Sequence, residues 1–394
     1  MSGVVVVGGG LAAGTAVTVL RENGYAGPVV LVAAEDHLPY ERPPLSKGYL
    51  LGDDPIDVVY LHDRAWYAEH GVELRLGEPA TAVDRAAGVV RTAAGELPYD
   101  RLVLATGAVP RRLRVADESG RPVSYLRTIE DARRLRAALA GAPRVAIVGG
   151  GWIGLEVAAA ARAAGAQVTV HEAAALPLLA VLGPEVARVF ADVHRAHGVD
   201  LRLGSAVSPA DLRGADHVVV GVGAVPQTAL AAAAGLPVDD GVLVDAHLRT
   251  ADPAVFAIGD VANVDHPVLG RRVRVEHWQT AIDHGTAVGR TLAGDATAMT
   301  AQPYFYTDQY DLGMEYVGSP GLAGYDRVVV RGDTREPRFT AFWLRAGTVV
   351  AGMHVNDWDA IDPIRALVGQ AVDAERLADA GAELGALADE VAAG

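Results

Sequence analysis

The first apolar run of the chain predicts a buried strand that enters a tight turn. Residues 4–7 are four valines, and residues 8–10 are three glycines. The pattern then predicts a helix over 11–23, closed by Gly24, and a second strand over 29–32. This β–turn–α–β order is the unit from which nucleotide-binding domains are built.

The same pattern recurs near the middle of the chain. A strand is predicted over 144–148, a glycine turn over 149–151 and a helix over 153–164 that Gly165 closes. A further strand follows over 167–171. The spacing indicates an internal duplication of a nucleotide-binding unit rather than a short solenoid repeat.

Two more apolar runs end in small residues and are followed by Ala-Val-Pro. They are residues 102–107 and 218–223, and the repeated tripeptides are 108–110 and 224–226. The uncharged stretch 218–238 is long enough to resemble a membrane span. Its prolines and glycines favour a buried strand, a turn and a short helix instead.

Beyond Gln302 the pattern changes. Aromatic residues gather at 304–306, and the apolar runs that follow suggest strands of an antiparallel sheet. The elements predicted there are strands over 328–330, 339–344 and 349–354, and helices over 360–368 and from about 377 onward. We therefore expect an α/β protein with two Rossmann-like domains and a C-terminal α+β domain. The predicted domains are 1–113 with 242–301 (first nucleotide), 114–241 (second nucleotide) and 302–394 (C-terminal).

Composition narrows the possible functions of these domains. The 394 residues include no cysteine, which excludes disulfides, thiolate metal ligands, self-bound iron–sulfur clusters and any thiol relay. We predict no metal site. The net charge of −15 argues against nucleic-acid binding. Because residues 1–3 lead directly into a strand without a basic leader, we expect no signal peptide, no membrane contact and a cytoplasmic location.

The first glycine motif is Gly8-x-Gly10-x-x-Ala13, where glycines allow pyrophosphate to approach the backbone at a helix N-terminus. Alanine at the third position still allows close packing of helix and strand. Glu35 follows the second strand and is expected to bind ribose hydroxyls. The alternative is a glycine-rich turn with Glu35 merely solvated.

The second motif is complete, with Gly149, Gly151 and Gly154 followed by Glu172 at the end of the next strand. A carboxylate there accepts a bond from the ribose 2′ hydroxyl and repels a 2′ phosphate. Residues 173–175 are all alanine, so no arginine stands ready to bind a phosphate. The second site therefore favours NADH over NADPH.

Other segments carry a family resemblance. Residues 255–260 form an apolar strand that ends in Gly-Asp, and we expect a helix after it. Here the chain resembles the flavoprotein pyridine-nucleotide oxidoreductases, whose fold is glutathione-reductase-like. More narrowly it resembles the ferredoxin reductases that serve oxygenase systems. The segments that carry this narrower resemblance are 40–47, 126–131, 275–278 and 303–309.

This resemblance implies that the first motif binds FAD and the second binds NADH. The implied FAD residues are Gly8, Gly10, Leu11, Ala12, Glu35, Arg42, Lys47, Ala80, Ala105, Arg127, Asp260 and Trp278. The implied NADH residues are Gly149, Gly151, Ile153, Gly154, Glu156, Glu172 and Gly223.

Lys47 and Glu156 are the predicted catalytic residues. The resemblance implies that they pair close to the nicotinamide. An ammonium near the flavin stabilises the negative charge that hydride transfer brings into the ring. We expect Glu156 in the first turn of its helix, where the dipole favours a carboxylate. The alternative is two unconnected surface charges.

The implied activity is electron transfer from NADH through FAD to a small iron–sulfur ferredoxin. That carrier would serve a cytochrome P450 or a ring-hydroxylating dioxygenase. A rubredoxin reductase or a direct NADH oxidase remains an alternative, and a redox-sensing protein resembling apoptosis-inducing factor is a more distant one. The lack of cysteine argues against disulfide reductases and NADH peroxidases of the same superfamily.

Two clusters of arginines are candidates for docking an acidic ferredoxin, although each also fits a solvated loop. The candidates are Arg111, Arg112, Arg114, Arg271, Arg272 and Arg274. We expect a monomer or a weak homodimer. One departure concerns Tyr306, because several members of the family carry a tryptophan there that is associated with electron exit.

Overall fold

The computed structural model describes residues 3–141, 143–320 and 324–393. The expectation of no signal peptide rested on residues 1–3, and residues 1 and 2 lie outside the described ranges. The chain divides into two compact units. Unit 1 comprises 1–43, 55–109 and 224–302, and unit 2 comprises 44–54, 110–223 and 303–394. The predicted three-domain boundaries stay a prediction.

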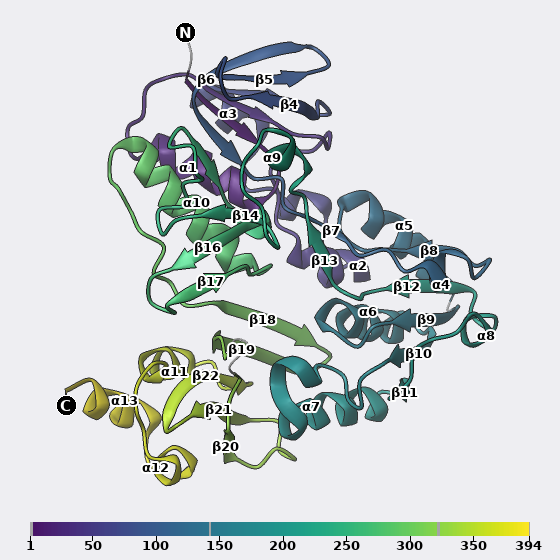
Figure 1. Ribbon diagram of the computed structural model, residues 1–394. Helices are drawn as coiled ribbons and strands as arrows, with labels where there is room; N and C mark the ends of the chain where they lie inside the picture. The colour runs from purple at the N-terminus through teal and green to yellow at the C-terminus, as the bar shows by residue number, and fades with distance from the viewer. Residues whose placement is uncertain (1–2, 142, 321–323, 394) are drawn as a thin grey trace. The chain divides into compact units, whose positions relative to one another are not determined.

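Unit 1 is built on a seven-stranded sheet whose central strands are parallel (Figure 1). The order is β3-β2-β1-β6-β5-β4, and β15 also pairs with β6. The strands are β1 (Gly3–Val7), β2 (Val29–Val32), β3 (Val72–Arg75), β4 (Ala80–Asp84), β5 (Val89–Thr92), β6 (Gly95–Leu104) and β15 (Val255–Ala257). Because β1 is buried along its whole length, four consecutive valines suit it.

Helices α1 (Leu11–Glu22) and α10 (Trp278–Ala293) pack closely against one another in unit 1. Figure 1 shows them running side by side. Gly285 and Gly289 lie on the contact face of α10. A Cβ at Gly289 would lie 2.8 Å from the Cβ of Val19 and 2.9 Å from the carbonyl oxygen of Ala16. The close approach of the two helices therefore depends on these glycines.

The remaining elements of unit 1 are short. A three-stranded sheet has the order β14-β16-β17, and the two Ala-Val-Pro segments pair as β7 and β13. The bounds are β7 (Ala108–Pro110), β13 (Ala224–Pro226), β14 (Val242–Val244), β16 (Ala262–His266), β17 (Arg271–Val273), α3 (Arg64–Glu69), α9 (Ala229–Ala233), η2 (Ile56–Val59) and η3 (Gly259–Val261).

Unit 2 contains a parallel sheet of order β11-β10-β9-β12-β8. In β9, Val145 and Ile147 face α5 and α6, whereas Ala146 and Val148 face α4 and α8. This period of two places helices on both faces of the sheet. The bounds are β8 (Val123–Ser124), β9 (Arg144–Val148), β10 (Gln167–Glu172), β11 (Asp200–Leu203), β12 (His217–Val220), α2 (Gly48–Leu51), α4 (Arg114–Asp117), α5 (Ile129–Leu139), α6 (Trp152–Ala163), α8 (Pro209–Leu212) and η1 (Pro43–Ser46).

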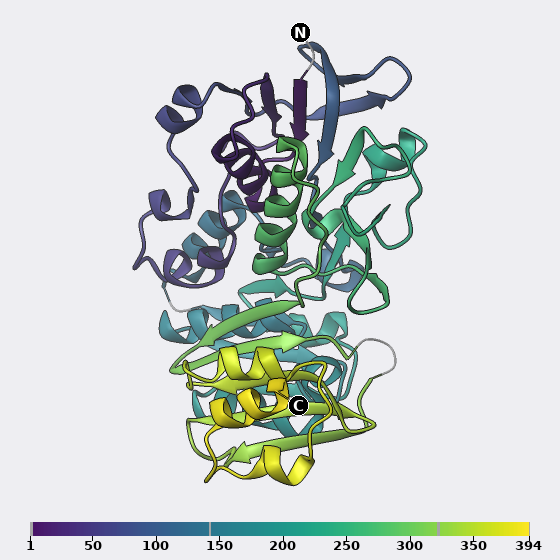
Figure 2. The same ribbon diagram turned by 90° about the vertical axis from the view of Figure 1, so that its left-hand side faces the viewer.

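The C-terminal part of unit 2 is an antiparallel sheet of order β18-β19-β22-β21-β20. Helix α7 (Leu179–Ala196) covers one face through Leu182, Val186 and Phe190. Helices α11–α13 cover the other face and stand in front of the sheet in Figure 2. The bounds are β18 (Tyr304–Gln309), β19 (Leu312–Gly318), β20 (Arg327–Gly332), β21 (Phe339–Arg345), β22 (Thr348–Val355), α11 (Ile361–Leu367), α12 (Ala374–Ala378) and α13 (Leu384–Ala393).

The structure confirms the predicted α/β class and most of the predicted elements. The stretch 218–238 is β12, β13 and α9, as expected, and no helix among the described residues has the length and apolar character to cross a membrane. One local expectation is wrong. Gly259 and Asp260 themselves lie in the 3-10 turn η3, which leads directly into β16 where we expected a helix, and Gly259 has φ +70°.

Candidate functional site

The turn between β1 and α1 has room for an anion. Gly8 has φ +140°, and a Cβ there would lie 2.1 Å from the carbonyl oxygen of Ala105. A Cβ at Gly10 would meet nothing within 4 Å. Gly10 caps α1 without a side-chain hydrogen bond, and the first turn, which begins with Leu11 and Ala12, holds no acidic residue. The first amides of α1 can therefore donate to a pyrophosphate.

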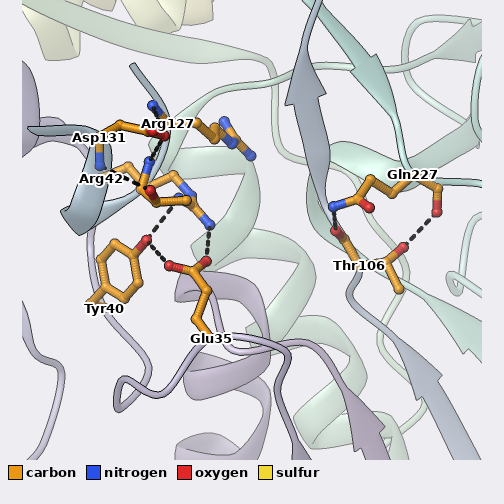
Figure 3. Close-up of polar contacts among 8 residues, drawn as sticks. Glu35, Tyr40, Arg42, Thr106, Arg127, Asp131 and Gln227 are labelled. Carbon is orange, nitrogen blue, oxygen red and sulfur yellow. Dashed lines mark hydrogen bonds and ion pairs between the residues drawn. The ribbon is translucent and has the colours of Figure 1, made fainter. Parts of the chain in front are cut away.

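Glu35 belongs to a polar cluster at the end of the second strand region (Figure 3). The Tyr40 hydroxyl donates to Glu35 Oε2 at 2.8 Å, and Arg42 Nη1 donates to the Tyr40 hydroxyl at 2.9 Å. Arg42 Nη2 lies 3.4 Å from Glu35 Oε1. Burial lowers the pKa of Arg42, but Tyr40, Glu35 and Asp260 outweigh it, so that pKa is raised. The cluster holds Glu35 beside a permanent cation.

The Gly259-Asp260 turn is held by His284 of α10 and by Arg274, which precedes that helix. Gly259 N donates to Nδ1 of His284 at 3.1 Å, and Arg274 Nη1 donates to the carbonyl oxygen of Asp260 at 3.3 Å. Burial lowers the pKa of His284 to about 4. His284 is therefore a neutral acceptor that holds the turn.

Trp278 is the first residue of α10, and its indole is fixed in place. The indole Nε1 donates to Glu41 Oε2 at 3.0 Å. Glu41 lies next to Arg42 in the segment that the resemblance singled out. Two other predicted FAD residues are small: Ala80 begins β4, and Ala105 is buried just after β6. Thr106, the next residue, donates from Oγ1 to the Gln227 carbonyl oxygen at 2.8 Å (Figure 3).

The second glycine turn, between β9 and α6, is also closely built. A Cβ at Gly149 would lie 2.3 Å from the carbonyl oxygen of Gly221, and one at Gly154 would lie 2.0 Å from that of Gly149. Glu172 Oε2 accepts from the Gly150 amide at 2.6 Å, and Oε1 accepts from the Ala174 amide at 2.7 Å. Backbone donors thus orient the Glu172 carboxylate beside the turn.

Two further predicted NADH residues lie in this unit. Ile153, in the first turn of α6, has a side chain that is 43% exposed despite its size. Gly223 follows β12 with φ +95°, a conformation that favours glycine. Gly151 caps α6 without a side-chain hydrogen bond, like Gly10 at α1. The first amides of α6 are therefore also available to an anion.

Lys47 and Glu156 form the predicted ion pair, with Lys47 Nζ 2.8 Å from Glu156 Oε1. The Glu156 carboxylate is only 5% exposed. It also accepts hydrogen bonds from Ser46 Oγ at 2.5 Å and Thr307 Oγ1 at 2.7 Å. The expected first-turn position is wrong, because α6 begins at Trp152 and places Glu156 in the second turn. The ion pair and two hydroxyls, rather than the helix dipole, balance its charge.

Strand β18 also supplies groups near Lys47. Lys47 Nζ lies 5.4 Å from the centre of the Tyr306 ring, within cation–π range. Burial raises the pKa of Asp308, Lys47 opposes this rise, and Glu156 and Glu315 add to it. Tyr306, at the position where the resemblance implied a tryptophan in several members, thus contacts the predicted catalytic lysine.

Arg127 stands directly before a well-capped helix (Figure 3). Its backbone amide donates to Asp131 Oδ2 at 3.2 Å. Thr128 and Asp131 form a reciprocal capping box at the start of α5. The cap fixes the backbone that carries the Arg127 side chain.

Comparison with known proteins shows the family to which the chain belongs. The pyridine nucleotide-disulphide oxidoreductase family matches residues 2–285, which is more than half of the chain. The chain belongs to that family. A reductase C-terminal domain family matches residues 304–388.

Several similar proteins are named as reductases of ferredoxin or of putidaredoxin. The chain is 43% identical to the ferredoxin–NAD(+) reductase component of the anthranilate 1,2-dioxygenase system of Burkholderia cepacia, over 95% of this chain and 96% of the relative. It is 37% identical to putidaredoxin reductase of Pseudomonas putida, over 90% and 88%. The crystal structure of the covalent putidaredoxin reductase–putidaredoxin complex matches with a TM-score of 0.94 at 35% identity, covering 100% of this chain and 99% of that chain.

This member of the pyridine nucleotide-disulphide oxidoreductase family is an FAD-dependent oxidoreductase. Its residues fit the flavin cofactor, because the uncapped N-terminus of α1 and the open position at Gly10 suit a pyrophosphate. Its sequence contains no cysteine, so the disulfide chemistry in the family's name cannot occur on this chain.

The predicted docking arginines differ in availability. Arg274 is only 12% exposed and lies between Asp240 and Glu276, at 3.1 and 2.5 Å. Arg272 donates to the carbonyl oxygens of Val244 and Asn263. These two guanidinium groups serve the fold of unit 1.

The docking candidates of unit 2, Arg111, Arg112 and Arg114, are more exposed. Arg112 is 70% exposed, pairs with Asp117 and stacks over Tyr125, whereas Arg114 is 87% exposed and pairs with Glu118. Arg111 is exposed as well. These side chains can change partner at little cost, because exposed ion pairs contribute little to stability.

Sequence reasoning missed the residues that hold the predicted ones. Ser46, Thr307 and Glu41 were not singled out individually, although each lies in a segment that carried the resemblance. Their signal was position within those segments. Residue type alone could not reveal them, because serine, threonine and glutamate are common on any surface.

Proposed function

We propose that the protein is an NADH-dependent reductase that passes electrons through FAD to a small iron–sulfur ferredoxin serving an oxygenase. The observation that carries this proposal is a chain with two nucleotide-binding turns and no cysteine. Without a thiol relay of its own, it must pass electrons to a separate acceptor. The relatives named as ferredoxin–NAD(+) reductase components support this assignment.

The chain's own residues would divide the work as follows. FAD, when bound, supplies the chemistry that converts a hydride into single electrons. Gly8, Gly10 and the first amides of α1 would hold its pyrophosphate, and Glu35 would accept bonds from a ribose. Asp260 and Trp278 would hold the ribityl and ring end. Each of these roles rests on the family resemblance together with the local geometry described above.

In unit 2, the residues of the second turn would bind NADH. The first amides of α6 would hold the pyrophosphate, while Glu172 would accept from the 2′ hydroxyl and repel a 2′ phosphate. Lys47 would stabilise negative charge that develops beside it during hydride transfer. Glu156 would hold that ammonium in place through their 2.8 Å contact.

We place the ferredoxin contact at the open arginines of unit 2, namely Arg111, Arg112 and Arg114. A cluster of exposed cations suits an acidic carrier, because it steers association more than it strengthens binding. A cytoplasmic location and a monomer or weak homodimer stay predictions.

The first test is reduction of the purified protein. We expect the protein to retain FAD and to be bleached by NADH in a stopped-flow instrument much faster than by NADPH. A colourless protein without flavin would overturn the proposal. Faster reduction by NADPH would overturn the role of Glu172 alone.

Acceptor preference separates the remaining alternatives. Reduced protein should transfer electrons to a ferredoxin faster than to a rubredoxin or to oxygen. Faster transfer to rubredoxin would assign the chain to the branch of its 34–35% identical rubredoxin reductase relatives. Rapid peroxide formation without a carrier would assign it as an NADH oxidase.

A further inference from the structure

A row of buried polar side chains runs behind Glu156 in unit 2. It links β18 to α7 through three residues that are almost inaccessible to solvent: Thr307, Gln309 and His194. Strand β18 and helix α7 are both marked in Figure 1. Buried polar groups cost stability unless they are bonded to one another, so this row requires an explanation.

The contacts are continuous from Glu156 to His194. Thr307 Oγ1 lies 2.7 Å from Glu156 Oε1, and Gln309 Nε2 lies 3.1 Å from Thr307 Oγ1. His194 Nε2 lies 2.8 Å from Gln309 Oε1, and the Tyr310 hydroxyl lies 3.3 Å from His194 Nδ1. Thr307 and Gln309 occupy alternate, inward positions of one strand.

The carboxylate fixes the direction of every bond in the row. Because an ionised Glu156 can only accept, Thr307 must donate to it and must accept from the Gln309 amide. The Gln309 carbonyl then accepts from His194, which must carry its proton on Nε2. The Tyr310 hydroxyl donates to the remaining nitrogen. All four bonds point toward Glu156.

The imidazole in this row is neutral, because burial lowers the pKa of His194 to about 4. A neutral, uniformly oriented row polarises each bond in the same sense and strengthens the donor at its end. It is a poor proton path, since the Gln309 amide does not readily pass protons on. The arrangement therefore suits the fixing of a carboxylate rather than proton conduction.

We propose that Thr307 and Gln309 are positioning residues that fix the Glu156 carboxylate against Lys47, with His194 as their buried anchor. This inference rests on the proposed function, because it assumes that the Lys47–Glu156 pair acts during hydride transfer. Ser46 holds the second oxygen of the carboxylate, so Thr307 determines how the oxygen facing Lys47 is oriented. Loss of that bond would let both charges move.

Thr307→Val tests this directly, because it removes the hydroxyl and keeps the shape of the side chain. We expect about a tenfold slower reduction of the FAD-loaded protein by saturating NADH, with little change in the NADH concentration that gives half the maximal rate. Thr307→Ser should restore the rate to within about twofold. Gln309→Leu should slow reduction in the same way.

Thr340→Val is the matched control, because Thr340 is a buried strand threonine of the same unit outside this row. It should leave the reduction rate within about twofold of the unchanged protein. Thermal unfolding of each variant separates loss of folding from loss of positioning. If Thr307→Val and Gln309→Leu reduce as fast as Thr340→Val, the proposal is overturned.

Two measurements do not depend on turnover. The flavin midpoint potential, determined by dye equilibration without NADH, should become more negative in Thr307→Val and return in Thr307→Ser. Nitrogen-15 NMR of histidine-labelled holoprotein should show His194 protonated on Nε2 alone. An unchanged potential, or a proton on Nδ1, contradicts the proposal.

Lys47→Met distinguishes this inference from the proposed function. If Lys47→Met slows reduction and Thr307→Val does not, only the positioning role fails. If neither variant slows reduction, the role of the ion pair itself fails.

Discussion

At the scale of single residues, the candidate site is a set of charges that are held rather than left in solvent. Glu35 is held by Tyr40 and Arg42, Glu172 by two backbone amides, and Glu156 by Lys47 with two hydroxyls. Fixed charges can act on a bound group without reorganising, which is the condition under which they affect catalysis most.

Replacing Lys47 with methionine should slow flavin reduction by NADH about 100-fold, since it removes a preorganised charge worth about 3 kcal/mol. Stopped-flow absorbance at saturating NADH measures this rate. Lys47→Arg keeps the charge and should recover part of it. Equal rates for the unchanged protein and Lys47→Met would contradict a catalytic role for the lysine.

Replacing Glu172 with alanine should weaken discrimination against NADPH. A carboxylate bond to a ribose hydroxyl would be worth about 2 kcal/mol, so the ratio of kcat/KM for NADH over NADPH should fall at least tenfold. Steady-state kinetics with both nucleotides measure this ratio. Glu73→Ala is a suitable control, because Glu73 is an exposed strand carboxylate of unit 1. An unchanged ratio would remove Glu172 from the nucleotide site.

At the scale of elements, the apolar pattern predicted the two β–turn–α–β units closely. The predicted strand over 144–148 matches β9, and the helix predicted over 153–164 is α6, shifted by one residue. Strand β18 was missed because its inward positions include Thr307 and Gln309, so polar residues occupy the face that usually carries the apolar signal.

In the candidate site, too, the local features were predicted from the sequence and the long-range contacts were not. Glycine turns and the acids after the strands are local signals, and the sequence revealed them. The contacts of Glu156 with Ser46 and Thr307 join residues that are 110 and 151 positions apart. Neither contact can be inferred from spacing, because only the folded sheet and helix bring these side chains together.

The α1–α10 contact gives a prediction at this scale. Gly289→Val should destabilise the protein by about 1–3 kcal/mol, since the new side chain would overlap Val19 and the Ala16 carbonyl. Urea unfolding followed by circular dichroism measures this. Gly214→Val is the control, because a Cβ at Gly214 meets nothing within 4 Å. Equal losses in the two variants would show that the glycine contact is not what matters.

At the scale of the whole molecule, stability should depend on buried neutral histidines. The folded-state pKa of His284 is lowered to about 4 from an ordinary value of 6.5, and that of His194 is lowered similarly. Between these values the unfolded chain binds protons that the folded chain does not. The contribution of these histidines to the free energy of unfolding is therefore fully present above pH 6.5 and is lost as the pH falls toward 4.

This loss should amount to about 2 kcal/mol per buried histidine at pH 5. Urea unfolding at pH 7 and pH 5 measures it. His284→Asn keeps an acceptor for the Gly259 amide and cannot titrate in this range, so its stability should fall less between the two pH values. If the stability of His284→Asn depends on pH as strongly as that of the unchanged protein, His284 is not a source of this loss.

Partner recognition also belongs to the whole molecule. Arg114→Glu should raise the KM for an acidic ferredoxin several-fold at low salt and flatten its salt dependence, because it weakens electrostatic steering. Arg335→Glu is the matched control, being equally exposed and equally paired with a neighbouring carboxylate. Identical effects of the two reversals would indicate a response to net charge instead of a docking site.

Electrons should leave this cysteine-free chain for a separate iron–sulfur protein. The most direct measurement is an anaerobic single turnover in which NADH-reduced protein is mixed with an oxidised ferredoxin in a stopped-flow instrument. We predict that the flavin reoxidises and the iron–sulfur absorbance bleaches at the same rate, with two ferredoxins reduced per flavin. Flavin that stays reduced until oxygen is admitted would contradict electron transfer to a ferredoxin.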